Sequence, residues 1–152
     1  MGAPQPLCFS WSFLAHLFAL LDAGGEGGPR ITLALTRYES ETLPESACSP
    51  LIQEYRGSHD CFIFRPPLPS TVIAAVNHEQ NRYQAENVVI HEMRKHGVLV
   101  LNPSKSLKLV HRHEEDLRQW LPPVDAKEDS RYARAIPISL AEAFEMARNR
   151  NP

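Results

Sequence analysis

The stretch that decides the fold of this chain is GVLVLNPSKSLKLVHRHEEDLRQWL, residues 97–121. Gly97 is the residue type expected just after the last turn of a helix. The next four residues, 98–101, are all apolar, which is typical of a strand buried on both faces of a sheet. Asn102 and Pro103 then turn the chain. The stretch therefore predicts a buried strand that ends in a polar turn, where α/β proteins often bind ligands.

Two structures fit the residues after this turn. In the first, residues 106–110 form a strand that pairs back on residues 98–101. In the second, Asn102 is the N-cap and Pro103 the first residue of a helix that runs to residue 121. We favour the helix, because one of its faces is largely apolar. That face comprises Leu107, Val110, Glu114, Leu117 and Leu121.

Three upstream segments complete the predicted core. Residues 31–37 alternate apolar and polar side chains, which is the period of a strand. Residues 61–64 are all apolar and predict a second strand, which the prolines after it end. Ser70 can cap a helix, and the apolar positions after it repeat at helical spacing. Residues 70–96 are therefore predicted to form one helix.

The chain begins with an apolar segment, residues 9–21, that lacks the marks of a signal peptide. No Lys or Arg precedes it, and Leu21 stands where a cleavage site needs a small residue. The segment is also too short and too interrupted by polar residues to span a bilayer. We interpret it as a buried helix. The glycine-rich residues 24–29 are interpreted as a linker, because a phosphate-binding loop would follow a strand and precede a helix.

Strand and helix alternate from residue 31 to the end of the chain. The pattern from Ser139 to Glu142 is a capping box and predicts a last helix over residues 140–149. Such alternation is typical of an α/β protein. We predict a three-layer α/β domain with a small, mostly parallel sheet flanked by helices. Its parts are an N-terminal helix and glycine-rich linker (1–30), an α/β core domain (31–125), and a loop with a C-terminal helix (126–152).

Length and composition place the chain among ordinary globular domains. It has 152 residues, of which 43% are hydrophobic and 22% charged, and its net charge is −2. A protein without basic excess is poorly suited to nucleic acid, so the charge argues against that partner. Cys8, Cys48 and Cys61 are scattered and form no CxxC pair, which favours reduced thiols and a cytoplasmic location.

Arg65 is the strongest candidate for ligand binding. It follows a predicted buried strand and precedes two prolines, so we expect it at the carboxyl edge of the sheet. A guanidinium there could hold a carboxylate or phosphate through two hydrogen bonds. The alternative is a structural ion pair, with Asp60 as the nearest candidate. Asn102 and Ser104 are expected at the same edge, although capping alone would explain Asn102. Arg65, Asn102 and Ser104 are therefore the predicted substrate-binding residues.

The histidines do not predict a metal site. His111 and His113 would point in one direction from a strand, but on the favoured helix they lie on nearly opposite sides. The spacing of His91 and His96 also makes them diverge on a helix. The sequence contains no G-x-S-x-G motif either. No catalytic residue and no metal ligand is assigned.

Two segments together resemble a known family. CFIFRPPLP (61–69) and KHGVLVLNPSKSL (95–107) are similar to the amino-terminal domain that precedes the ATP-grasp fold in glutathione synthetase-like and RimK-like ligases. The resemblance covers residues 60–121. It implies that Arg65 is the substrate-loop arginine, that Asn102 is the turn asparagine, and that residues 107–121 form the helix leading to the ATP-binding domain.

The chain departs from this family at one motif, in its length, and in residues 1–10, which do not read as the first strand that the family places before its initial helix. Where relatives keep a lysine preceded by an acidic residue, this chain has Arg112 and His113. An ATP-grasp domain would also need well over a hundred residues after Pro152. The resemblance therefore implies a substrate-side lobe that is truncated or stand-alone and not catalytic by itself. ATP and Mg²⁺ would enter only with a following catalytic domain. The expected partner is a small carboxylate or peptide-like ligand. No association with a membrane is expected, and a homo-oligomer is compatible with the sequence.

Two other functions compete with this interpretation. A winged-helix nucleic-acid module would use residues 78–96 as its recognition helix and residues 98–111 as a hairpin wing tipped by Lys105. The third possibility is a small protein-interaction scaffold without a small-molecule site.

Overall fold

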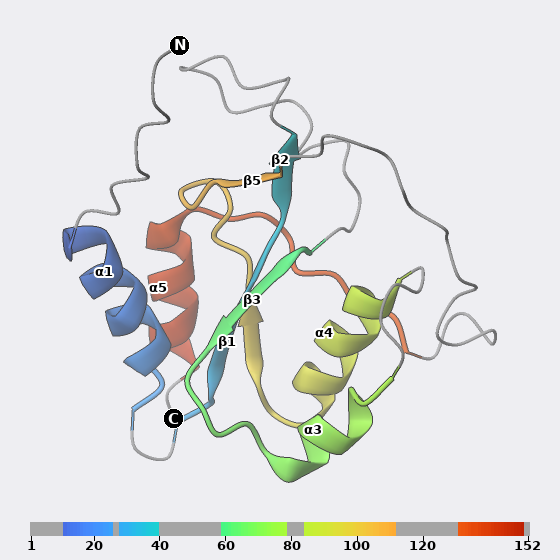
Figure 1. Ribbon diagram of the computed structural model, residues 1–152. Helices are drawn as coiled ribbons and strands as arrows, with labels where there is room; N and C mark the ends of the chain where they lie inside the picture. Colours follow the sequence, from blue (N-terminus) through green and yellow to red (C-terminus); the bar gives the residue numbers. More distant parts are fainter. Residues whose placement is uncertain (1–10, 26–27, 40–58, 79–83, 112–130, 151–152) are drawn as a thin grey trace.

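The computed structural model describes residues 11–25, 28–39, 59–78, 84–111 and 131–150 (Figure 1). In chain order their elements are α1 (Trp11–Asp22), β1 (Ile31–Leu35), β2 (Arg37–Glu39), β3 (Cys61–Phe64), α3 (Ser70–Ala75), α4 (Ala85–Lys95), β4 (Leu99–Leu101), β5 (Leu109–His111) and α5 (Leu140–Asn149).

The described strands form two small sheets. In the three-stranded sheet the order is β3-β1-β4, and β2 and β5 form a second, two-stranded sheet. β1 is parallel to β4 and antiparallel to β3, whereas β2 and β5 are parallel. The α/β class is confirmed, but the three-stranded sheet is mixed and not mostly parallel as expected, because β3 is antiparallel to β1. A short apolar run predicts a buried strand without fixing its direction, which is why the error arose.

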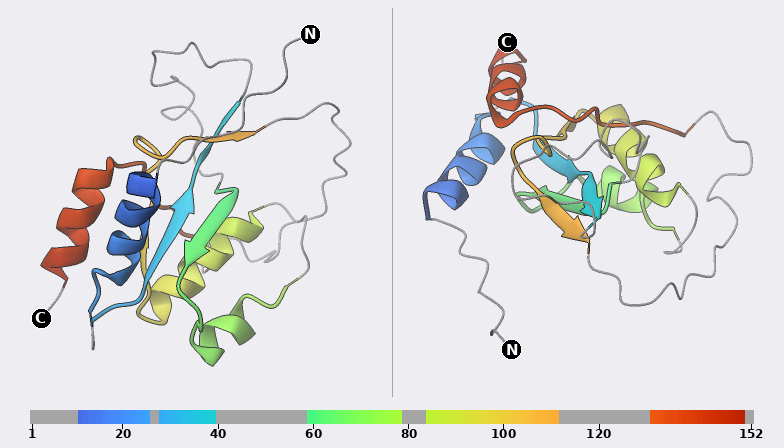
Figure 2. Two further views of the ribbon diagram at one scale, coloured as in Figure 1. Left: turned by 60° about the vertical axis from the view of Figure 1, so that its left-hand side comes forward. Right: turned by 90° about the horizontal axis from the view of Figure 1, so that it is seen from above.

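Helices cover both faces of the three-stranded sheet, as expected for three layers. α1 and α5 lie on one face, and α3 and α4 lie on the other (Figures 1 and 2). Residues 98–101, which include β4, alternate between the two cores: Leu99 and Leu101 pack on the first side, and Val98 and Val100 pack on the second. The apolar run at 98–101 therefore serves two hydrophobic layers at once, as its composition predicted.

The helix predicted over residues 70–96 is divided in two. α3 begins after Pro69, which is its N-cap, so Ser70 lies inside the helix and does not cap it. α4 begins after Gln84, whose φ of 64° is in the left-handed region. α3 ends at Ala75, two residues before Asn77, and asparagine has low helix propensity. The end of α4 matches its prediction, because Gly97 adopts φ 79° and the Val98 N–H donates to the Met93 carbonyl at 2.9 Å.

The helix predicted after the Asn102 turn is not formed over the residues described. Residues 103–107 make only a turn, in which the Leu107 N–H donates to the Pro103 carbonyl at 2.9 Å. Leu107 is buried in the core, and β5 then pairs with β2 in register Arg37↔Leu109. The alternative hairpin on residues 98–101 is not formed either, because β4 pairs with β1. Residues 112–121 lie outside the described part of the chain.

The last helix and the segment before it follow local signals in part. The capping box of α5 is confirmed: the Glu142 N–H donates to Ser139 Oγ at 3.2 Å, and the Ser139 N–H donates to Glu142 Oε2 at 2.6 Å. Residues 131–139, here called the strap, run extended beside α4 and the end of β4 (Figure 1). Their only β-bridge among the described residues joins Asn102 and Pro137.

One buried polar group in β1 should cost stability. Thr32 is fully buried, and its Oγ1 has no hydrogen-bond partner among the described residues. Thr32→Val should therefore raise the free energy of unfolding by about 1 kcal/mol, because it removes an unsatisfied hydroxyl without changing the shape of the side chain. Urea unfolding followed by circular dichroism would measure the change.

Thr36→Val is the matched control, because the Thr36 Oγ1 accepts a hydrogen bond from Asn102 Nδ2 at 2.8 Å. This substitution should lower the free energy of unfolding. Equal losses of stability in both variants would contradict the interpretation of Thr32.

Candidate functional site

The structure separates the predicted site residues into two places. β3 is antiparallel to β1 with Phe64 opposite Thr32, so Arg65 lies at the amino end of β1. Asn102 follows Leu101, which pairs with Leu33 further along β1, so it lies toward the opposite end. The expectation that Arg65 and Asn102 share the carboxyl edge of the sheet is therefore wrong. It failed because the direction of β3 was assumed to match that of β4.

Asn102 has a buried side chain whose hydrogen bonds connect segments distant in the sequence. It is 1% exposed, and its Nδ2 donates to Thr36 Oγ1 and to the Ala135 carbonyl, both at 2.8 Å. Its Oδ1 accepts from the Thr36 N–H at 3.3 Å. Ser104, in the turn that follows, is fully buried. The turn brings these two predicted residues together, but neither side chain is open to a ligand.

Arg65 is exposed and paired with the end of α1. Its Nε and Nη2 donate to the two carboxylate oxygens of Asp22 at 3.0 and 2.8 Å. The guanidinium also lies over the ring of Phe18, 4.6 Å from the ring centre. The hydrogen bond with Asp22 raises the pKa of Arg65, so the guanidinium stays charged. The structural ion pair considered for Arg65 is thus present, but with Asp22, whereas Asp60 contacts Arg37 at 3.4 Å.

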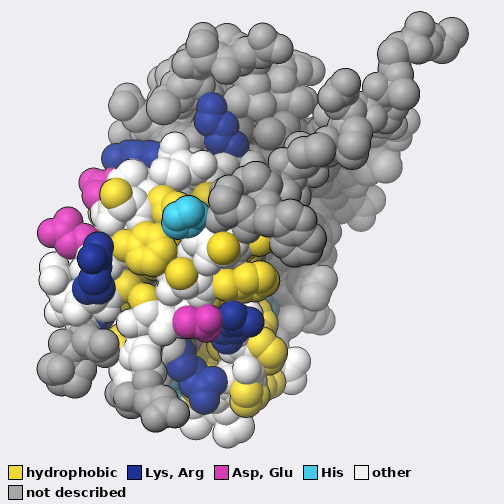
Figure 3. Space-filling view, turned by 90° about the vertical axis from the view of Figure 1, so that its left-hand side faces the viewer, with side chains coloured by type: hydrophobic (Ala, Val, Ile, Leu, Met, Phe, Trp, Pro, Cys, Tyr) yellow, Lys and Arg dark blue, Asp and Glu magenta, His cyan; other side chains and the backbone are white. Residues whose placement is uncertain are grey.

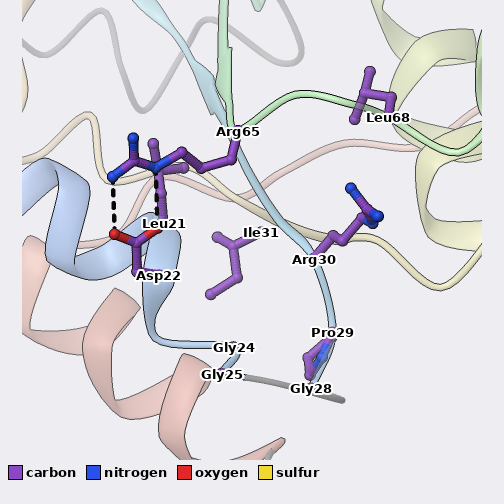
Figure 4. Close-up of a pocket in the computed structure, with 10 residues that line it drawn as sticks. All are labelled: Leu21, Asp22, Gly24, Gly25, Gly28, Pro29, Arg30, Ile31, Arg65 and Leu68. Atoms are coloured by element: carbon purple, nitrogen blue, oxygen red, sulfur yellow. Dashed lines mark hydrogen bonds and ion pairs between the residues drawn. The ribbon is translucent and has the colours of Figure 1, made fainter.

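A small pocket lies beside this ion pair (Figure 4). Its volume is about 280 Å³. The end of α1, the glycine-rich turn, the start of β1 and the segment after β3 form its walls. We call it the Arg65 pocket. It is lined by Leu21, Asp22, Gly24, Gly25, Gly28, Pro29, Arg30, Ile31, Arg65 and Leu68.

Arg30 supplies a second positive charge to this pocket. It is exposed, and its Nη1 donates to the Pro67 carbonyl. Among the described residues no carboxylate pairs with it. Among the described residues, the lining holds two guanidinium groups and one carboxylate, that of Asp22, an excess of positive charge suited to an anion.

The glycines give the pocket its shape. Gly25 adopts φ 60°, and a β-carbon on Gly24 would collide with the Pro29 carbonyl oxygen. Both positions therefore require glycine, Gly25 for its backbone conformation and Gly24 for the close approach of Pro29. The segment was interpreted from its sequence as a linker, and this tight turn was missed. Asp22 was missed as well, although an acidic residue in the last turn of a helix opposes the helix dipole and is a signal in itself.

Other kinds of site find little support in the described part of the chain. No group of three or more His, Cys, Asp or Glu residues is placed there to hold a metal ion. Burial, with the charge of Asp60, raises the pKa of Cys61, which makes its thiol a poor nucleophile. Within the same residues, no helix combines the length and apolar character needed to cross a membrane.

The fold and the pocket together define a class: a three-layer α/β domain with a small cationic pocket at the amino end of β1. Comparison adds no particular family to this class. No protein-family model matches the chain, and neither a curated protein nor a solved structure is significantly similar to it. Its function has to be argued from the pocket.

Proposed function

We propose that this chain is a binding domain that holds a small carboxylate or peptide-like anion in the Arg65 pocket and is not catalytic by itself. The observation that carries the proposal is the excess positive charge of the pocket, which comes from Arg30 beside the Arg65–Asp22 pair. Guanidinium groups bind carboxylates in a fixed, two-bonded geometry, so the chemistry of the lining favours this ligand class.

The size and the apolar part of the lining narrow the ligand further. At about 280 Å³ the pocket is at the small end of the range for ligand sites. Leu68 offers partly exposed apolar surface near the charged groups, and Leu21 and Ile31 form the buried apolar floor of the pocket. A short aliphatic acid or an acidic dipeptide fits this combination better than a nucleotide with its large base.

The place of this domain in a larger system is part of the proposal. We propose the substrate-side lobe of an ATP-dependent carboxylate–amine ligase-like protein, located in the cytoplasm. The support is the sequence resemblance and the position of Arg65 after β3. One feature that the resemblance implies is not found, because no helix begins at Leu107. The separate expectation that Asn102 lies beside Arg65 is also not met. ATP and Mg²⁺ would belong to a separate catalytic domain.

Isothermal titration with succinate and glycylglutamate tests the binding function. The wild-type chain should bind both, and Arg30→Ala and Arg65→Ala should each weaken binding by about tenfold or more, because each removes a charge-assisted hydrogen-bond donor. Succinamide, which has the same skeleton without charge, should not bind.

Arg134→Ala is the control variant for this titration. Arg134 is another exposed arginine, it contacts Tyr132, and it does not line the pocket. Its substitution should leave the affinity unchanged. Equal affinities of Arg30→Ala, Arg65→Ala and wild type would remove both arginines from the site.

The structure argues against one of the two rival functions and offers one observation for the other. The hairpin wing that a winged-helix module needs over residues 98–111 is not formed, because β4 and β5 pair with different strands. A protein-interaction scaffold has one observation in its favour. Apolar side chains gather on the face that holds α1 and α5 (Figure 3), where Phe18 and Met146 are 44% and 42% exposed. Titrations that detect none of the acidic ligands would favour the scaffold.

A further inference from the structure

We propose that Asp22 is an internal competitor at the Arg65 pocket: its carboxylate occupies the guanidinium of Arg65 until the carboxylate of a ligand replaces it. The inference rests on the anion-binding function proposed above and names how that site is regulated. It also names the ligand class, a dicarboxylate with one acid group for Arg65 and one for Arg30.

The Arg65–Asp22 contact has the geometry of a bound carboxylate. Two parallel hydrogen bonds of 3.0 and 2.8 Å join the two groups side by side. This is the arrangement in which a guanidinium recognises a free carboxylate ligand. Asp22 thus shows which group the exposed guanidinium binds and in which orientation.

The pair is open enough to exchange. The side chains of Arg65 and Asp22 are 50% and 57% exposed. Ion pairs this exposed contribute little to stability, because water solvates both partners when they separate. A ligand carboxylate can therefore replace Asp22 with little loss to the fold.

Asp22 also occupies an unfavourable position on its helix. It is the last residue of α1, where the partial negative charge of the helix end repels a carboxylate. The attraction of Arg65 offsets this repulsion only while the two are paired. Gly24 and Gly25 follow after Ala23, and Gly25 adopts a left-handed conformation. The acidic group is thus held at the pocket by one exchangeable contact.

Arg65 keeps a second support when Asp22 leaves. Its guanidinium lies 4.6 Å from the ring centre of Phe18, a cation–π contact that does not involve the carboxylate. Figure 4 shows the side chains of Arg65 and Arg30 on either side of Ile31, with their guanidinium groups turned in opposite directions. A ligand with one acid group at each end would engage both guanidinium groups once Arg30 turns from the Pro67 carbonyl toward the pocket.

Succinate titration of Asp22→Asn tests the inference. The amide keeps the size of the side chain but removes the charge that competes with the ligand. Asp22→Asn should bind succinate about fivefold more tightly than the wild type, the factor that an exposed ion pair can withhold. Adding Arg65→Gln to Asp22→Asn should abolish this gain. Glu145→Gln, which removes an exposed negative charge from α5, controls for net charge and should leave the affinity unchanged.

The outcomes separate the inference from the function beneath it. If the wild type binds succinate and Asp22→Asn binds it equally or less tightly, the competitor role is wrong while the binding function stands. If neither the wild type nor Asp22→Asn binds succinate, the binding function fails and the inference fails with it. Circular dichroism of each variant confirms that differences in affinity do not come from unfolding.

Discussion

Replacing Asn102 with alanine should lower the free energy of unfolding by about 3 kcal/mol. The side chain is 1% exposed and joins Thr36, between β1 and β2, to the turn after β4 and to the strap. Without it, the Thr36 N–H and the Thr36 hydroxyl lose their bonds to the amide, while the Ala135 carbonyl keeps its contact with His59 Nε2 at 3.1 Å. Unsatisfied polar groups of this kind each cost about 1–3 kcal/mol, and the costs do not add in full.

Urea unfolding at neutral pH, followed by circular dichroism, measures this loss. The control is Lys105→Ala in the same turn, because Lys105 is exposed and its substitution should change stability by about 0.5 kcal/mol or less. A loss of less than about 1 kcal/mol for Asn102→Ala would contradict the structural role assigned to the amide.

The second large effect is expected at Arg131, the first residue of the strap. Its Nε donates to Glu92 Oε1 at 2.8 Å, and its Nη2 donates to the Ala75 carbonyl at 3.0 Å. Glu92 is 3% exposed, so Arg131→Ala would leave a buried carboxylate without its closest cation. The free energy of unfolding should fall by about 3 kcal/mol at pH 7. In Glu92→Gln, where no buried charge remains, the further substitution Arg131→Ala should cost much less.

This loss should depend on pH in a defined direction. Burial by itself would raise the pKa of Glu92, but the hydrogen bond and charge of Arg131, with Lys95 and His91, outweigh burial and lower it. A lowered pKa stabilises the fold above the unfolded value of about 4.3, and this stabilisation is lost as the pH falls through the folded value. In Arg131→Ala the effect of burial on the pKa of Glu92 is no longer outweighed. Protonation of Glu92 then removes the buried charge, so the loss of stability in this variant becomes smaller as the pH falls.

Unfolding curves at pH 7 and pH 4 therefore distinguish this account from a general loss of packing. The difference in stability between wild type and Arg131→Ala should be largest at pH 7 and smaller at pH 4. A difference that stays constant between the two pH values would show that the charge of Glu92 does not cause the effect.

Local signals in the sequence were sufficient wherever a few neighbouring residues decide the structure. Gly97 ends α4 in the left-handed conformation, and the capping box opens α5. The signal at Asn102 and Pro103 misled for a physical reason. These residues can begin a helix, but the burial of Leu107 and the pairing of β5 with β2 favour a single turn and a strand. Contacts with distant residues thus outweighed the local preference.

Of the charged residues in the Arg65 pocket, only Arg65 itself could be predicted from the sequence. Arg65 was identified from its place between an apolar strand and two prolines. Asp22 and Arg30 lie far from Arg65 in the sequence, and all three line one pocket because β3 is antiparallel to β1. Strand direction is a tertiary property, which the composition of four apolar residues does not encode. For the same reason the sequence wrongly predicts Asn102 beside Arg65. Asn102 is buried and lies toward the other end of β1.

The central claim is that the Arg65 pocket binds a dicarboxylate through its two arginines. Arginine side-chain Nε–H resonances in ¹H–¹⁵N NMR spectra, recorded while succinate is added to the wild-type protein, test it most directly. The resonances of Arg65 and Arg30 should shift together and saturate, while that of Arg134 stays in place and succinamide moves none of them. Resonances of Arg65 and Arg30 that do not shift, or shifts of the same size at every arginine, would contradict the account.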